Sequence, residues 1–259
     1  MLLTTFASGS TGNCALVCAG GGNILIDAGI SMKRIRENLA LSGFLPEDLA
    51  GILITHEHSD HISGLEMMIK YHGTPVYAPE TLARNLRQVV RGAERCLHVI
   101  PVGDGFELGG MNVTAFRTPH DTDESVGYRM ECGCALGFAT DMGCVTEEVL
   151  DALYGCEAVL IEANHDTDML MRGPYPPHLK RRILSPHGHL SNSDCAHLAV
   201  ALADNGTRYI VLGHLSRENN TPELAYKTVS EALGDREVYL AAAPMAGRLT
   251  VCVEETAQC

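Results

Sequence analysis

The sequence predicts an α/β fold built as one domain. Short apolar runs typical of strands alternate with helix-like stretches along all 259 residues, which is the pattern of α/β proteins. Hydrophobic residues make up 46% of the chain and charged residues 20%, which is enough apolar material for a sizeable core. No Pro/Ser-rich linker or change of composition divides the chain, so we expect a single domain over residues 1–259.

The N-terminal half begins with three strands joined by glycine-rich turns. Ser31 is placed to cap a helix that ends near Gly43, and an apolar strand then leads directly into His56. Further helices are expected over residues 59–71 and 80–91. The expected strands of this half are residues 2–6, 15–18, 24–27, 51–55, 97–100, 106–108, 111–117, 125–132 and 135–141.

The C-terminal half repeats the alternation around one irregular segment. Residues 164–190 contain four prolines and two glycines, and a long irregular insert in a compact domain is often a functional loop region. The expected helices are residues 146–154, 192–204 and 222–233, and the expected strands are 158–162, 209–213, 238–241 and 249–253.

Charge and cysteine usage limit the classes of function. Thirty-two acidic residues against 19 basic ones give a formal charge of −13, which argues against binding polyanions through a broad basic surface but not against a local positive site. The ten cysteines include no C-x-x-C pair and indicate reduced thiols. No apolar segment reaches the ~18 residues of a membrane span, and no signal peptide is recognisable. We expect a cytoplasmic protein without a membrane partner, and no obligate protein partner is readable.

The strongest chemical signal is the run Thr-His-Glu-His-Ser-Asp-His at residues 55–61. Side chains at i and i+2 of an extended backbone point the same way, so His56 and His58 can converge on one ion. Asp60 and His61 lie where a helix is expected to begin and point toward a neighbouring position. Imidazole and carboxylate ligands suit Zn²⁺ and similar divalent metals, so this run predicts a metal site.

Further ligand candidates lie where other strands end. His120, Asp141 and His214 each follow an apolar strand, and α/β proteins gather their sites at such strand ends. Asp27 ends the third expected strand and is a carboxylate of the kind that orients a ligating histidine by a hydrogen bond.

This set of residues resembles the five-motif signature of the metallo-β-lactamase-fold hydrolases, with the motifs in the expected order over most of the chain. The resemblance implies a four-layer αββα sandwich with the metals at one edge, between two sheets. It implies that His56, His58 and His120 hold a first metal, that Asp60, His61 and His214 hold a second, and that Asp141 bridges them. The presence of His58, His61 and Asp141 points to a dinuclear hydrolytic centre, with Asp60 and Asp141 also counted as catalytic.

Four strings resemble the YycJ/WalJ group of this superfamily, which is associated with exonuclease activity on DNA. They are FASGSTGNC at residues 6–14, EANHD at 162–166, GHLSN at 188–192 and GHLSRENN at 213–220. The resemblance implies a phosphodiester substrate, DNA first among them, and two divalent ions, Zn²⁺ or Mn²⁺.

The remaining site predictions concern proton transfer and substrate contact. His189 and His165 lie in the irregular segment and are the candidates for protonating the leaving oxygen. The predicted substrate contacts come from the loops around the motifs: Ser10, Asn13, Asn164 and Ser191. Lys180, Arg181 and Arg182 either guide phosphates or form a solvated helix face.

Three hypotheses for function follow. The leading one is a dinuclear-metal-dependent phosphodiesterase that acts as a DNA exonuclease. The second is a small-molecule metallohydrolase acting on a small phosphodiester, thioester or lactone, which the overall acidity favours. The third is a non-catalytic metal-binding regulator, which the complete ligand set disfavours. The sequence leaves the cleavage polarity and oligomeric state open.

Overall fold

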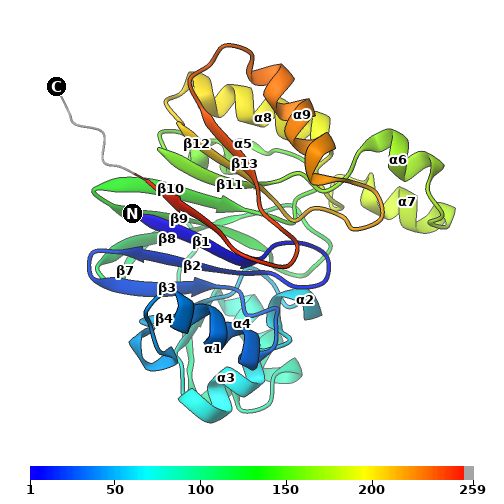
Figure 1. Cartoon of the computed structure of the whole chain (residues 1–259). Coiled ribbons are helices and arrows are strands. Elements are labelled where there is room, and N and C mark those ends of the chain that lie inside the picture. The colour runs from blue at the N-terminus through cyan, green and yellow to red at the C-terminus, as the bar shows by residue number, and fades with distance from the viewer. Residues whose placement is uncertain (254–259) are drawn as a thin grey trace.

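The chain folds into two β-sheets that are stacked face to face, with helices on the outer side of each (Figure 1). This computed structural model describes residues 1–253, so residues 254–259 of the predicted domain lie outside the described residues. Apolar side chains such as Ile24 and Leu53 from one sheet meet Phe138 and Leu160 from the other to form the central core. The layer order is helix, sheet, sheet, helix, which confirms the predicted αββα sandwich.

The first sheet has the strand order β14-β1-β2-β3-β4-β5-β6. Its outer face is covered by α1 (Met32–Leu41), α3 (Leu65–His72) and α4 (Glu80–Val89), whose apolar sides are buried against the strands. Ser31 caps α1 as predicted, because its hydroxyl accepts from the backbone N–H of Arg34. The strands are β1 (Leu2–Ala7), β2 (Cys14–Ala19), β3 (Gly22–Ile26), β4 (Gly51–Leu53), β5 (Val76–Ala78), β6 (Leu97–Val99) and β14 (Leu249–Cys252), with short 3₁₀ helices at Pro46–Asp48 and Ala93–Arg95.

The second sheet has the strand order β13-β12-β11-β10-β9-β8-β7. Its outer face is covered by α5 (Glu147–Leu153), α8 (Asn192–Asp204) and α9 (Pro222–Leu233). The strands are β7 (Gly105–Leu108), β8 (Met111–Arg117), β9 (Val126–Cys132), β10 (Cys134–Ala139), β11 (Ala158–Glu162), β12 (Tyr209–Gly213) and β13 (Tyr239–Ala242).

Strand direction brings the ends of many strands to one edge of the sandwich. Strands β3, β4, β5 and β6 are parallel to one another, as are β10, β11, β12 and β13. Strand β8 runs in the same direction as β10, since both are antiparallel to β9. The loops after these carboxyl ends therefore meet at the edge where α/β proteins place their sites.

Three local expectations differ from the structure. The helix predicted over residues 59–71 is two helices, α2 (Ser59–Ile62) and α3, which are separated at Gly64. The backbone packs too closely there for any side chain, because a Cβ on Gly64 would lie 2.1 Å from the carbonyl oxygen of Ile30. The three-residue strand β5 was not predicted. The irregular segment 164–190 contains two short helices, α6 (Thr167–Arg172) and α7 (Pro177–Ile183).

Two further points concern the cysteines and membrane-spanning helices. Cys14 and Cys195 are buried, and burial raises the pKa of both thiols. Across residues 1–253, no helix combines the length and apolar character needed to cross a bilayer.

Candidate metal centre

All seven sequence-predicted metal ligands lie at the same edge of the sandwich, and their ligand atoms form overlapping groups in which all atoms lie within 4.8 Å of one another. The strands deliver them from widely separated parts of the chain. The loop after β4 carries His56, His58, Asp60 and His61; His120 follows β8, Asp141 follows β10 and His214 follows β12.

The backbone turns sharply at three of the strand ends. Asp27, Asp141 and His214 have φ angles of +60°, +57° and +53°, and they are the only non-glycine residues among 1–253 with positive φ. Such a conformation costs on the order of 1–3 kcal/mol for each residue and is typical of functional sites.

The first ligand group consists of His56, His58 and His120. Nε2 of His120 lies 3.3 Å from Nδ1 of His58, so the two ring nitrogens face each other. Nδ1 of His120 faces the carbonyl oxygen of Gly188 at 3.1 Å. Because a carbonyl only accepts, Nδ1 carries the proton and Nε2 is left as a metal ligand.

The second ligand group consists of Asp60, His61 and His214. Oδ2 of Asp60 lies 3.4 Å from Nε2 of His61 and 3.6 Å from Nε2 of His214. Asp141 lies between the two groups, since its Oδ2 is 3.3 Å from Nε2 of His61 and its Oδ1 is 3.8 Å from Nε2 of His120. Asp141 therefore lies close to ligand atoms of both groups.

Asp27 lies behind His61, on the side of the ring away from the other ligand atoms. Nδ1 of His61 donates to Oδ2 of Asp27 at 2.7 Å, and both groups are fully buried. The backbone N–H and the hydroxyl of Thr55 donate to the same carboxylate at 2.9 and 3.0 Å. Burial disfavours the protonated ring of His61, but the carboxylates of Asp141 and Asp27 outweigh it and raise its pKa to about 10.

Glu162 is a site residue that the sequence analysis missed. It ends β11 fully buried, and its Oε1 accepts from Nδ1 of His189 and of His214, both at 2.8 Å. Its Oε2 accepts backbone N–H groups from Met142 and Leu190 at 2.9 and 3.1 Å. Burial raises its pKa, but the two histidines prevail and hold the pKa well below its ordinary value. An acidic residue that ends an apolar strand, as Asp27 and Asp141 do, was the available signal.

Unpaired buried atoms test whether this donor set fits metal ions. Nε2 of His56, Nε2 of His214 and Oδ2 of Asp141 are buried and have no hydrogen-bond partner in the described part of the chain. Buried polar atoms are almost always paired, so three such atoms at one edge indicate a missing partner. Histidine nitrogens and carboxylate oxygens are the ligands that divalent cations such as Zn²⁺ accept, so these residues fit a bound divalent metal ion.

The two predicted proton donors lie in different surroundings. The side chain of His189 is 24% exposed and lines a cavity of about 220 Å³ beside Asp60, Asp141 and His214. Burial lowers its pKa, but the carboxylates of Glu162 and Asp141 raise it above the ordinary value overall. His165 is buried, does not line this cavity, and has no hydrogen-bond partner for its ring among residues 1–253. The structure therefore does not support His165 as the proton donor.

Of the four predicted substrate contacts, two line the cavity and two do not. Ser10 and Asn164 line the cavity, although the Asn164 amide also donates to the carbonyl of His214 at 2.9 Å. The Asn13 amide donates to Oδ2 of Asp60 at 3.3 Å, so it positions a ligand rather than facing the cavity. Ser191 does not line the cavity; its hydroxyl caps α8 by accepting from the backbone N–H of Asp194 at 3.1 Å.

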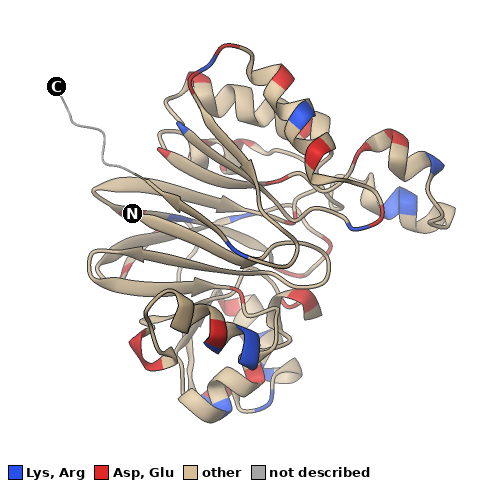
Figure 2. Ribbon diagram, in the orientation of Figure 1, with Lys and Arg blue, Asp and Glu red and all other residues tan. Residues whose placement is uncertain are grey.

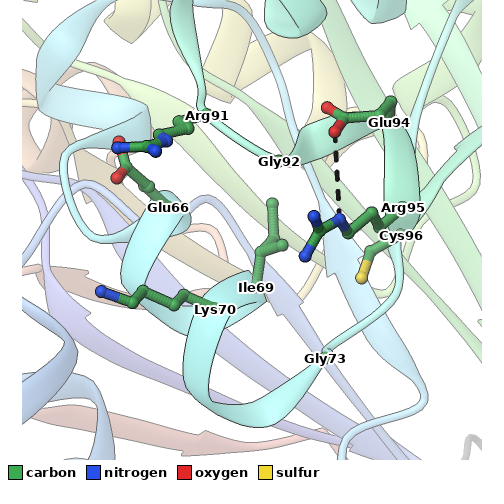
Figure 3. Close-up of a pocket in the computed structure, with 9 residues that line it drawn as sticks. All are labelled: Glu66, Ile69, Lys70, Gly73, Arg91, Gly92, Glu94, Arg95 and Cys96. Atoms are coloured by element: carbon green, nitrogen blue, oxygen red, sulfur yellow. Dashed lines mark ion pairs between the residues drawn. The ribbon is translucent and has the colours of Figure 1, made fainter.

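A larger cavity of about 480 Å³ lies away from these ligands, between α3 and the segment that follows α4 (Figure 3). Its walls carry three cationic and two acidic side chains, all exposed: Lys70, Arg91, Arg95, Glu66 and Glu94. The charges are mixed, and within the described residues the ligand groups all lie at the strand-end edge. We therefore place the functional site in the smaller cavity.

Comparison with known proteins agrees with this architecture. The family model described as "Beta-lactamase superfamily domain" matches residues 22–215. The exodeoxyribonuclease WalJ of Streptococcus pneumoniae is 37% identical over 236 residues, covering 90% of this chain and 88% of its own. The exodeoxyribonuclease YycJ of Bacillus anthracis is 36% identical, covering 90% and 89%.

A solved structure shares the fold at low sequence identity. The metallo-β-lactamase fold protein YhfI from Bacillus subtilis superposes with a TM-score of 0.74 at 14% identity, covering 96% of this chain and 99% of its own. The sheet order, the strand-end ligands and the sequence matches agree, and the family implies divalent metals. The chain is a member of the β-lactamase superfamily and, within it, of the family of the WalJ and YycJ exodeoxyribonucleases.

Proposed function

We propose that this protein is a metal-dependent phosphodiesterase that degrades DNA from an end, using two divalent ions, Zn²⁺ or Mn²⁺. The observation that carries the proposal is the pair of ligand groups with Asp141 between them. The relatives that match over nine-tenths of the chain are named exodeoxyribonucleases, which supports DNA as the substrate.

The ligand assignment follows the two groups. His56, His58 and His120 would hold one ion, whereas Asp60, His61 and His214 would hold the other, with Asp141 shared. Divalent ions bound there would lower the pKa of a water molecule and neutralise negative charge that develops on the phosphate.

The chain itself supplies the proton for the leaving oxygen. His189 reaches the cavity, and Glu162 fixes its ring through the 2.8 Å hydrogen bond to Nδ1. That bond leaves Nε2 to act on the substrate, and the carboxylates of Glu162 and Asp141, which raise the pKa of the ring, favour its protonated form. His189 is thus the proposed general acid, and Glu162 is the residue that orients it.

A small-molecule hydrolase is the second candidate. The net charge of −13 and the size of the cavity, about 220 Å³, favour a small ester over a long polyanion. The positive charge of bound ions offsets this acidity where the substrate would bind, so a DNA end that is held locally is compatible with the charge.

The test is digestion of end-labelled DNA by the protein loaded with Zn²⁺ or Mn²⁺. We expect stepwise release of nucleotides by the wild type and none by a double variant Asp60→Ala with His61→Ala. The matched control is Asp151→Ala with His197→Ala, which changes the same residue types on exposed helix faces and is expected to retain activity. Undiminished cleavage by the double ligand variant contradicts the proposal, and faster turnover of small esters than of DNA favours the second candidate.

A further inference from the structure

The segment between Glu162 and His189 forms an arm that carries α6 and α7 and projects beside the site (Figure 1). Its two helices are tied together, because Nζ of Lys180 donates to the carbonyl oxygens of Met171 and Gly173 at 2.7 and 2.8 Å. The end of the arm packs directly on the loop after Asp141. A Cβ on Gly143 would lie 2.4 Å from the backbone nitrogen of Gly188. The arm is therefore a fixed wall of the site.

The inner side of this arm faces the metal ligands across the cavity. Tyr175, Leu179, Arg182 and Ile183 line the cavity opposite Asp60, Asp141 and His189. Tyr175 is half-buried, and within the described residues its hydroxyl makes no hydrogen bond. The basic residues of α7 gather on this arm (Figure 2). Arg182 is the one of them at the cavity, where it pairs with Asp121 next to His120.

These side chains match the parts of a nucleotide. An aromatic ring stacks on a nucleobase without regard to sequence, since every base has a π-face. A guanidinium binds phosphate oxygens through paired N–H groups. Leu179 adds an apolar surface to the same cavity. The protein has a net charge of −13, so an arginine beside the ligand groups provides a local positive charge for a phosphate, and the aromatic ring in the same cavity provides a surface for a base.

We propose that Tyr175, Leu179 and Arg182 form a subsite for the terminal nucleoside of a single DNA strand. Tyr175 stacks on the terminal base, and Arg182 binds the phosphate next to it. This inference rests on the proposed nuclease function and names the part of the DNA that the arm recognises.

The size of the cavity explains why the subsite holds an end. Its volume of about 220 Å³ is below the roughly 300–1,000 Å³ common for small-ligand sites. The arm closes one side of it, so a strand enters end first. Recognition of one base by stacking is tolerant of sequence, as the removal of successive nucleotides of any sequence requires.

The test compares single-stranded oligonucleotides that end in a normal nucleotide or in an abasic one, with the steady-state KM and kcat as readouts. For the wild type, we expect KM to rise on the order of tenfold when the terminal base is missing, the size expected for one lost base–aromatic stacking contact. Tyr175→Ala is expected to raise KM about as much for the normal oligonucleotide and to lose the distinction between the two ends. In Tyr175→Phe, which keeps the ring, both KM values should be preserved.

Two further variants separate the contacts. Arg182→Gln is expected to raise KM for both oligonucleotides alike, because it removes a phosphate contact and not a base contact. Tyr226→Ala on α9 removes an exposed tyrosine away from the cavity and serves as the control with unchanged KM. The subsite is refuted if the wild type degrades DNA but Tyr175→Ala keeps the wild-type KM or still distinguishes the abasic end. Failure of the wild type to degrade any DNA refutes the proposed function itself, and the subsite with it.

Discussion

Replacing Glu162 by glutamine removes the buried carboxylate that accepts hydrogen bonds from both His189 and His214. In the wild type, the carboxylate accepts four hydrogen bonds, two from these rings and two from the backbone N–H groups of Met142 and Leu190. The glutamine oxygen can still accept the backbone bonds. Its NH₂ group then faces two ring N–H groups, so donors oppose donors where the carboxylate accepted.

The structure sets the size of the expected effect. Removing one partner of a fully buried ion pair costs roughly 3–5 kcal/mol, because the remaining charge is left without compensation. We expect Glu162→Gln to lower the free energy of unfolding of the metal-free protein by about that amount. Loss of the carboxylate behind a ligating histidine reduces metal affinity or activity about 10- to 100-fold, and we expect the same range for kcat/KM on DNA.

Two assays check this prediction. Denaturant unfolding of the metal-free protein gives the stability change, and competition with a chelating dye gives the metal affinity. The matched control is Glu131→Gln at the other end of the second sheet, where the carboxylate is 42% exposed and pairs with Arg129. We expect that change to stay within about 0.5 kcal/mol. Wild-type stability and activity in Glu162→Gln would refute the role given to this carboxylate.

Three other predictions follow from the same site. The pKa of His61 in the metal-free protein is about 10, and a histidine must be neutral to bind a metal, so metal binding below that pH should release a proton and become tighter as the pH rises. Calorimetry in buffers of different ionisation enthalpy should detect this proton release, and zero release would count against His61 as a ligand. Thr55→Val removes a hydroxyl that donates to Asp27 and should weaken metal binding about tenfold, whereas Thr55→Ser keeps the hydroxyl and should not. Equal metal affinities of the two variants in the dye assay would argue against a role of this hydrogen bond in metal binding. His189→Asn should lower kcat on DNA by about 10²- to 10⁴-fold. The same change should lower kcat on a p-nitrophenyl diester much less, because that leaving group needs no proton. Equal losses of kcat on both substrates would exclude His189 as the general acid.

Much of the site was predictable because its residues are local or repeat one pattern. His56, His58, Asp60 and His61 lie within six residues after an apolar strand, and His120, Asp141 and His214 follow other strands. Parallel strands place such ends at one edge whatever the details of packing, so the grouping needed no coordinates.

The side chains whose positions could not be predicted from the sequence depend on tertiary packing. Residues 165 and 191 pair through an isolated β-bridge, and Ser191 is committed to α8 as its cap while His165 is buried away from the cavity. The role of Glu162 could not be predicted, because it depends on hydrogen bonds from His189 and His214, which are 27 and 52 positions away in the sequence. The end of a helix at Gly64 likewise depends on the distant backbone of Ile30.

The most direct test of the central claim is nucleotide release from end-labelled DNA, measured while Zn²⁺ or Mn²⁺ is titrated into the metal-free protein. We predict no release without metal and full activity once both proposed ligand groups are filled, with release of single nucleotides from an end. Release that is independent of added metal, or a fully loaded protein that releases no nucleotide, would contradict it.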